Sequence, residues 1–127
     1  MRYRFLNGAS TDCMTAKPTH LEGGAELDAF VDDHDVALIE CYTKGCSKCQ
    51  AMEPVLGNVA RATGIPVGMV NPGDDIELLE RLEISSVPTL LLYEDGAEIA
   101  RRAEGFIGGD GVVEFLEEHV PAAVDHA

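Results

Sequence analysis

Two kinds of apolar pattern divide the chain into strands and helices. Short continuous apolar runs at 36–42, 65–70 and 87–93 predict buried strands. Apolar residues three and four positions apart predict helices over 24–33, from the cysteines near 46 to Gly64, over 76–82 and over 111–119. A turn at 94–96 predicts a hairpin into a last strand at 97–104, and a brief edge strand is expected at 2–6. The order β-α-β-α-β-α-β-β-α predicts an α/β fold with a mixed sheet.

The length of 127 residues suits one domain with one core. Residues 1–18 show no sustained period, and we expect a loosely ordered extension there, followed by the folded domain at 19–127. No apolar run reaches the ~20 residues that span a bilayer, and the N-terminal stretch lacks the apolar segment of a signal peptide. A cytoplasmic location is therefore the expectation.

The charge is strongly acidic, with 23 Asp and Glu against 9 Lys and Arg and a net charge of -14. A field of this sign repels nucleic acid and anionic membranes, so neither is an expected partner. The acidic residues are spread along the chain, only three lysines are present and tryptophan is absent. Such a composition is typical of a cytosolic protein from a salt-accumulating halophile.

The segment CYTKGCSKCQ at 41–50 carries three of the four cysteines. Cys41, Cys46 and Cys49 have part of a plant-type iron–sulfur spacing, but no fourth cysteine follows them. Cys46 and Cys49 alone form C-x-x-C, which fits a redox dithiol or half a zinc site. The histidines supply no second spaced pair, so no metal site is expected, although one C-x-x-C could still carry a soft metal between proteins.

The surroundings of the C-x-x-C favour thiol chemistry. A strand leads into Cys46 and a helix begins there, so its sulfur lies at a helix N-terminus, where a thiolate is stabilised. Lys48 adds a positive charge nearby or is simply a solvated helix residue. Cys41 is expected to be a buried strand residue. Cys13, in the extension, is expected to be an incidental thiol, with a third redox cysteine or an intermolecular bridge as the alternatives.

Glu40 places a carboxyl inside the apolar run at 36–42. Burial of an unpaired carboxylate is costly, so its pKa is expected to rise toward neutrality. One interpretation makes Glu40 a proton acceptor for the inner cysteine, and the other makes it a solvated edge residue.

Several motifs together resemble the thioredoxin family. An acid six residues before the first cysteine, a C-x-x-C, a proline inside the following helix, V-P-T, a glycine turn and a glycine before the last helix occur in the family's order. They stand here at Glu40, Cys46 to Cys49, Pro54, Val87 to Thr89, Gly96 and Gly105, and the likeness runs from about Thr19 to Val120.

The resemblance implies a thioredoxin fold, a central mixed sheet flanked by helices on both faces. It implies a protein-disulfide reductase in which Cys46 attacks a client disulfide and Cys49, deprotonated with help from Glu40, resolves the mixed disulfide. A cis Pro88 would bring the Val87 backbone beside the dithiol, where an extended client segment can pair with it.

The resemblance also implies client contacts and partners. Gly45, Lys48 and Gly105 join Val87 and Pro88 as expected client-binding residues. Disulfide-containing clients and a regenerating reductase are the expected partners, the protein is expected to be a monomer, and the Cys46–Cys49 disulfide is the only redox group expected.

The chain departs from the family pattern close to the dithiol. Gly45 and Tyr42 stand where the family has tryptophans, Ser47-Lys48 replaces Gly-Pro, and an apolar residue near Ile65 replaces a lysine. A lysine near the thiolate favours a more oxidising couple, so an oxidant or isomerase remains an alternative, as does a metal carrier or adaptor without turnover.

Overall fold

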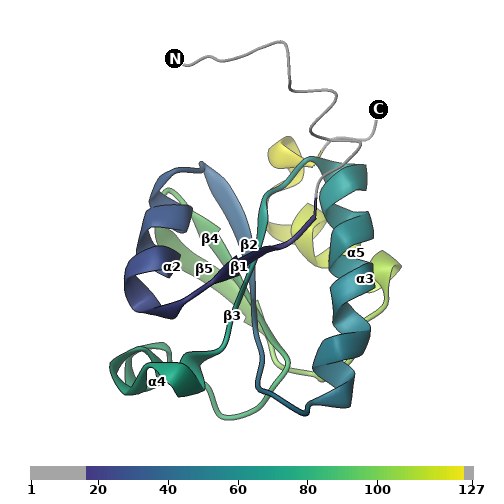
Figure 1. Ribbon diagram of the computed structural model, residues 1–127. Coiled ribbons are helices and arrows are strands. Elements are labelled where there is room, and N and C mark those ends of the chain that lie inside the picture. The colour runs from purple at the N-terminus through teal and green to yellow at the C-terminus, as the bar shows by residue number, and fades with distance from the viewer. Residues whose placement is uncertain (1–16, 125–127) are drawn as a thin grey trace.

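The computed structural model describes residues 17–124. Its elements are β1 (Thr19–Leu21), α2 (Gly23–Asp32), β2 (Val36–Cys41), α3 (Ser47–Thr63), β3 (Val67–Val70), η1 (Pro72–Asp74), α4 (Ile76–Leu82), β4 (Thr89–Glu94), β5 (Ala97–Arg102), α5 (Gly109–His119) and η2 (Pro121–Ala123). They form one five-stranded sheet with helices on both faces (Figure 1), as predicted. The edge strand predicted at 2–6 lies outside the described residues, as does Cys13.

The sheet has the strand order β1-β3-β2-β4-β5. β1, β3 and β2 run parallel, whereas β4 is antiparallel to β2 and β5 is antiparallel to β4. β2 is therefore central, and every residue from Val36 to Cys41 is buried. This explains its continuous apolar sequence, because both of its faces lie under helices.

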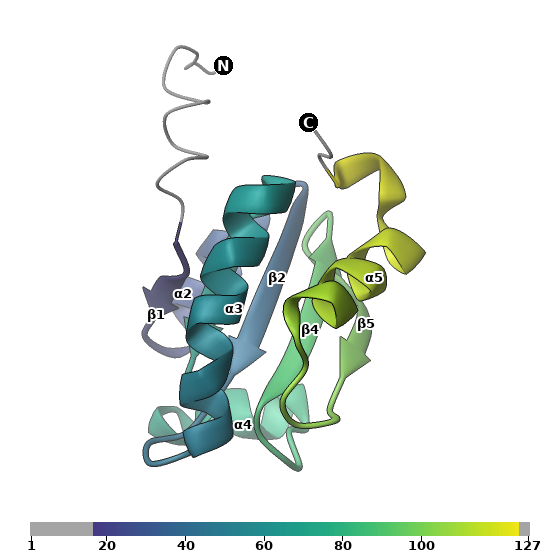
Figure 2. The ribbon, with the colours of Figure 1, turned by 90° about the vertical axis from the view of Figure 1, so that its right-hand side faces the viewer.

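Two hydrophobic cores lie on opposite faces of this sheet. Leu38 of β2 packs in the core beneath α3 and α5, whereas Ala37 and Ile39 pack in the core on the side of α2 and α4. Figure 2, turned to bring α3 and α5 to the front, shows these two helices lying across the strands. Alternate residues of β2 therefore belong to different layers of the protein.

Some element boundaries differ from the sequence prediction. β1 lies in a stretch to which no strand was assigned, because three residues are too few to show an alternation. The run at 65–70 is a strand only from Val67, and the run at 87–93 only from Thr89. In α4 the buried residues are Leu78 and Leu82, whereas Ile76, one of the apolar residues whose spacing predicts this helix, is 67% exposed.

Candidate active site

Cys46 and Cys49 form a disulfide at the N-terminus of α3. Cys46 is the N-cap residue, and its Sγ accepts a hydrogen bond from the backbone N–H of Cys49 at 3.2 Å. The two Cα atoms are 5.2 Å apart. Cys46 is half-buried, whereas Cys49 is only 2% exposed. The outer sulfur is thus accessible and the inner one is shielded, which suits an attacking thiol and a resolving thiol.

The local sequence explains this placement. Gly45 has a φ of +77°, a left-handed conformation that glycine adopts without strain, and it turns the chain into the cap. α3 then buries Met52, Leu56 and Val59 against the sheet, which anchors the helix beneath the dithiol. Pro54 lies inside α3, and Gly64 ends the helix in a left-handed conformation with its N–H bonded to the Ala60 carbonyl.

Cys41 is separated from this pair by the sheet. It is fully buried in the core on the side of α2 and α4, and its thiol is free. Burial raises the pKa of Cys41 to about 12, so it stays a thiol at neutral pH. The spacing that resembles a cluster motif therefore joins cysteines on opposite faces of the sheet.

Glu40 lies on the same face of β2 as α3 and is fully buried. Neither carboxyl oxygen has a hydrogen-bond partner among the described residues. Burial is the main cause that raises the pKa of Glu40 to about 8, and the nearby Glu53 carboxylate is the second. The expected rise toward neutrality is confirmed, and the interpretation as a solvated edge residue is wrong.

The predicted client-binding residues lie in two places. Gly45 and Lys48 are exposed beside the dithiol, and a Cβ built on Gly105 would lie 3.7 Å from Lys48 Nζ, so Gly105 adjoins the start of α3. The Val87–Pro88 peptide bond is cis and directly precedes β4. Thr89 of β4 pairs with Cys41 of β2, so the proline and the cysteine loop leave the sheet at the same end. The binding roles of these residues stay predictions.

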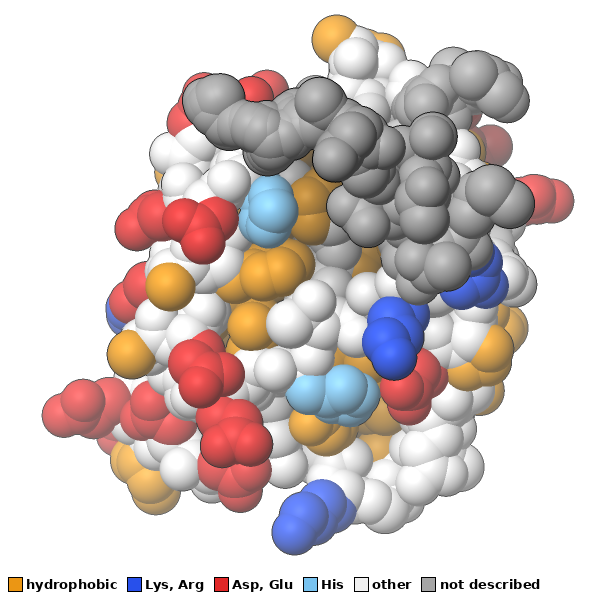
Figure 3. All heavy atoms as spheres, turned by 45° about the horizontal axis from the view of Figure 1, so that its top comes forward, with side chains coloured by type: hydrophobic (Ala, Val, Ile, Leu, Met, Phe, Trp, Pro, Cys, Tyr) orange, Lys and Arg blue, Asp and Glu red, His pale blue; other side chains and the backbone are white. Residues whose placement is uncertain are grey.

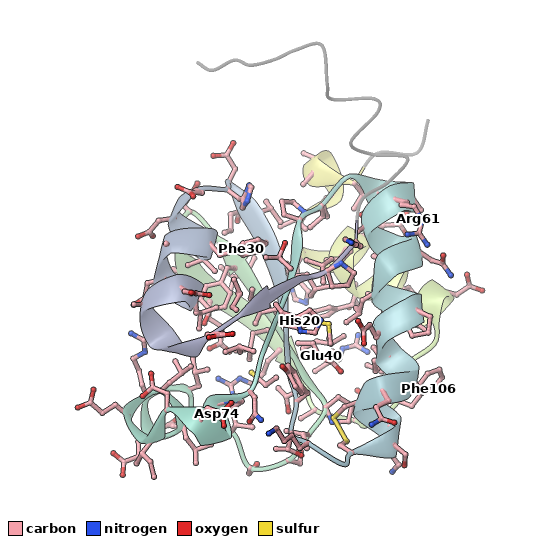
Figure 4. The ribbon with its side chains drawn as sticks, viewed as in Figure 1. His20, Phe30, Glu40, Arg61, Asp74 and Phe106 are labelled. Atoms are coloured by element: carbon pink, nitrogen blue, oxygen red, sulfur yellow. A yellow bond between two sulfur atoms is a disulfide. The ribbon has the colours of Figure 1, made fainter. Side chains whose placement is uncertain are left out.

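The structure also places two residues at the site that the sequence analysis missed. Glu53 of α3 and His20 of β1 line a pocket together with Cys49. Glu53 could have been found from sequence, because it lies four residues after Cys49 and shares its helix face. His20 gave no signal, since its strand was not predicted. Figure 4 labels Glu40 between His20 and the yellow disulfide in that view.

Among residues 17–124, no three His, Cys, Asp or Glu side chains gather as metal ligands do. Within the same range, no helix is long and apolar enough to cross a membrane.

A small α/β domain with a shielded and an accessible cysteine at a helix N-terminus is the arrangement of a dithiol oxidoreductase. Residues 19–118 match the family model described as Thioredoxin. A thioredoxin from Chlamydia caviae is 31% identical over 85 residues, which cover 66% of this chain and 82% of that protein. A thioredoxin from Chlamydia pneumoniae is 32% identical over 76 residues, which cover 59% and 74%.

Solved structures agree with the sequence relatives. A mutant thioredoxin from Halobacterium salinarum NRC-1 superposes with a TM-score of 0.76 at 26% identity, covering 89% of this chain and 96% of that one. The protein belongs to the thioredoxin family. It is a thiol–disulfide oxidoreductase that works through Cys46 and Cys49.

Proposed function

We propose that the protein works as a reductase of disulfides in client proteins. The observation that carries this proposal is the placement of the two sulfurs at the start of α3. The accessible Cys46 sulfur accepts a backbone N–H, and this hydrogen bond together with the helix dipole favours its thiolate. Cys49 is buried and bonded to Cys46, so we assign it to the mixed disulfide rather than to free clients.

In the forward reaction the Cys46 thiolate attacks one sulfur of a client disulfide. A bond forms between Cys46 and that sulfur, and the other client sulfur leaves as a thiolate and takes a proton from solvent. Cys49 then gives its proton to the Glu40 carboxylate and attacks Cys46. The second client sulfur leaves, so the client gains two electrons and the Cys46–Cys49 disulfide forms.

Glu40 is proposed as the proton acceptor in the second step. An acceptor works best when its pKa lies near the working pH, and the pKa of Glu40 is about 8. Its oxygens have no hydrogen-bond partner within the described part of the chain, which leaves them available for a proton. The buried position also keeps the exchange away from bulk solvent.

Clients are proposed to bind across the end of the sheet where the dithiol lies. Val87, next to the cis Pro88, offers backbone groups ahead of β4 to an extended client segment. Gly45 carries no side chain next to Cys46, and among the described residues no atom other than those of its chain neighbours lies within 4 Å of where its Cβ would stand. Lys48 and Gly105 lie next to each other at the start of α3 and are proposed to contact the client as well.

The location, oligomeric state and host of the protein are also proposed. We place it in the cytoplasm as a monomer, with a reductase that returns the disulfide to the dithiol. The charge of -14 supports a host that accumulates salt. Figure 3 shows acidic side chains gathered on the left-hand side of that view, the side of α2.

Reduction of a protein disulfide by the reduced protein in high salt tests this function. Wild type is expected to turn over with a dithiol donor, and Cys46→Ser to lose activity. Full activity of Cys46→Ser would refute the mechanism. The reduction potential decides the direction: a value near ~-270 mV supports a reductase, whereas one near ~-120 to ~-180 mV would instead mark an oxidant or isomerase.

A further inference from the structure

A pocket of about 230 Å³ opens beside the resolving cysteine. Cys49 and Glu53 line it from α3, His20 from β1, and Tyr42 from the end of β2. Met69 of β3 lines it as well, and the Cα of Met69 pairs with that of Glu40 on β2. The pocket therefore borders Cys49 directly and adjoins the strand position next to the buried Glu40.

The side chains of Glu53 and His20 meet at this pocket. Glu53 Oε2 lies 3.5 Å from His20 Nε2, with the two side chains 51% and 56% exposed. The His20 ring also meets the Tyr42 ring edge-on at 6.3 Å between centroids. The pair connects α3 to the edge strand β1 and holds a carboxylate and an imidazole beside Cys49.

The charge of Glu53 opposes the ionisation of Glu40. Both carboxyls lie on the α3 side of the sheet, with Glu40 buried and Glu53 half exposed, and a carboxylate opposes the ionisation of a second one nearby. The Glu53 charge contributes to the raised pKa of Glu40. A positive charge on His20 weakens this effect because it offsets Glu53.

We propose that Glu53 and His20 are positioning residues that set the pH at which Glu40 accepts the proton of Cys49. The proposal rests on the proposed role of Glu40 as proton acceptor. The negative charge of Glu53 keeps Glu40 protonated to higher pH, and positive charge at position 20 lets Glu40 ionise sooner. Neither residue is a reacting group in this mechanism; both act through Glu40.

Other titratable groups lie near Glu53 and His20. Lys44 lines the same pocket, and Glu22, Asp74 and Asp75 line a second pocket on the other side of His20. The pKa of Tyr42 is raised by burial first and then by surrounding carboxylates, so it stays neutral near pH 8. These groups form a constant background in a comparison of variants that change only positions 20 and 53.

Titration of the Glu40 side-chain carboxyl by ¹³C NMR, in the full chain with its dithiol oxidised, tests whether Glu53 and His20 change the ionisation of Glu40. Glu53→Gln removes the negative charge, and His20→Lys fixes a positive charge beside it. Both are expected to lower the Glu40 midpoint by roughly 0.5 to 1 pH unit, a moderate shift because the pair is half exposed. Glu80→Gln and His34→Lys make the same net charge changes elsewhere on the surface and are expected to leave the midpoint within 0.2 unit, about the precision of such a titration.

The rate of client release from the mixed disulfide, measured against pH, tests whether a shift in the ionisation of Glu40 changes the reaction. The alkaline rise of this rate is expected to move by the same amount and direction in Glu53→Gln and His20→Lys. An unmoved Glu40 midpoint, or one that moves equally in the controls, would overturn the inference and leave the role of Glu40 standing. A midpoint that moves while the release profile does not would overturn it too, because Glu40 would then not be the acceptor.

Discussion

The buried carboxyl of Glu40 makes the stability of the protein depend on pH, and Glu40→Gln should remove that dependence. Glu40 is fully buried and its oxygens have no hydrogen-bond partner within residues 17–124. The neutral acid and the neutral amide have nearly the same shape. The substitution therefore tests the cost of the charge with little change in packing.

The pKa of Glu40 gives the magnitude and the sign. It rises from an ordinary 4.5 to about 8 in the folded protein. Below 4.5 the group is protonated whether the chain is folded or unfolded, so there is no penalty. Between 4.5 and 8 the unfolded chain loses the proton first, and folding becomes less favourable as pH rises. At about 1.36 kcal/mol per pH unit, the full penalty above pH 8 is about 5 kcal/mol at most.

Urea unfolding of the oxidised protein between pH 5 and pH 9 measures this effect. The variant is expected to match wild type within about 1 kcal/mol at pH 5 and to exceed it by several kcal/mol at pH 9. Burial raises the pKa of Cys41 and of Tyr93 to about 12, but both groups are present in wild type and variant, so their contribution cancels in the difference between the two curves. Glu80→Gln is the control for loss of one surface charge. Parallel stability curves for wild type and Glu40→Gln would refute the reasoning.

Three further predictions concern residues outside the dithiol. Gly68→Ala should lower the free energy of unfolding in urea by roughly 1–3 kcal/mol, because the added Cβ would lie 2.8 Å from a Leu21 side-chain carbon. An unchanged unfolding midpoint would contradict this prediction. Asp75→Ala should lower the unfolding midpoint more than Asp74→Ala, because the Asp75 carboxylate accepts N–H groups at the starts of both α2 and α4. Cys41→Ala should keep disulfide-reductase activity, and alkylation of Cys41 in the folded protein would contradict its burial.

The sequence was most informative where both faces of an element are buried. The run at 36–42 has few polar positions because β2 is central, so its strand could be predicted without a structure. The helix after Cys46 was predictable for a different reason, since a long apolar stripe and a terminal glycine fix its face and its end. β1 was missed because its pairing with β3, rather than its own three residues, makes it a strand.

The candidate site was predictable only in part. Cys46, Cys49 and the burial of Glu40 follow from spacing and from the apolar run around them. The separation of Cys41 from the dithiol depends on which face of β2 each side chain takes, and this needed the sheet. The contact between His20 and Glu53 joins positions far apart in the chain, so local patterns could not reveal it.

Trapping of the mixed disulfide tests the central claim most directly. Reduced Cys49→Ser is expected to form a covalent adduct with a disulfide-containing protein, released by dithiothreitol and mapped by mass spectrometry to Cys46. Cys46→Ser is expected to form no adduct through Cys49, because the Cys49 side chain is buried. An adduct at Cys49, or none at Cys46, would contradict the account.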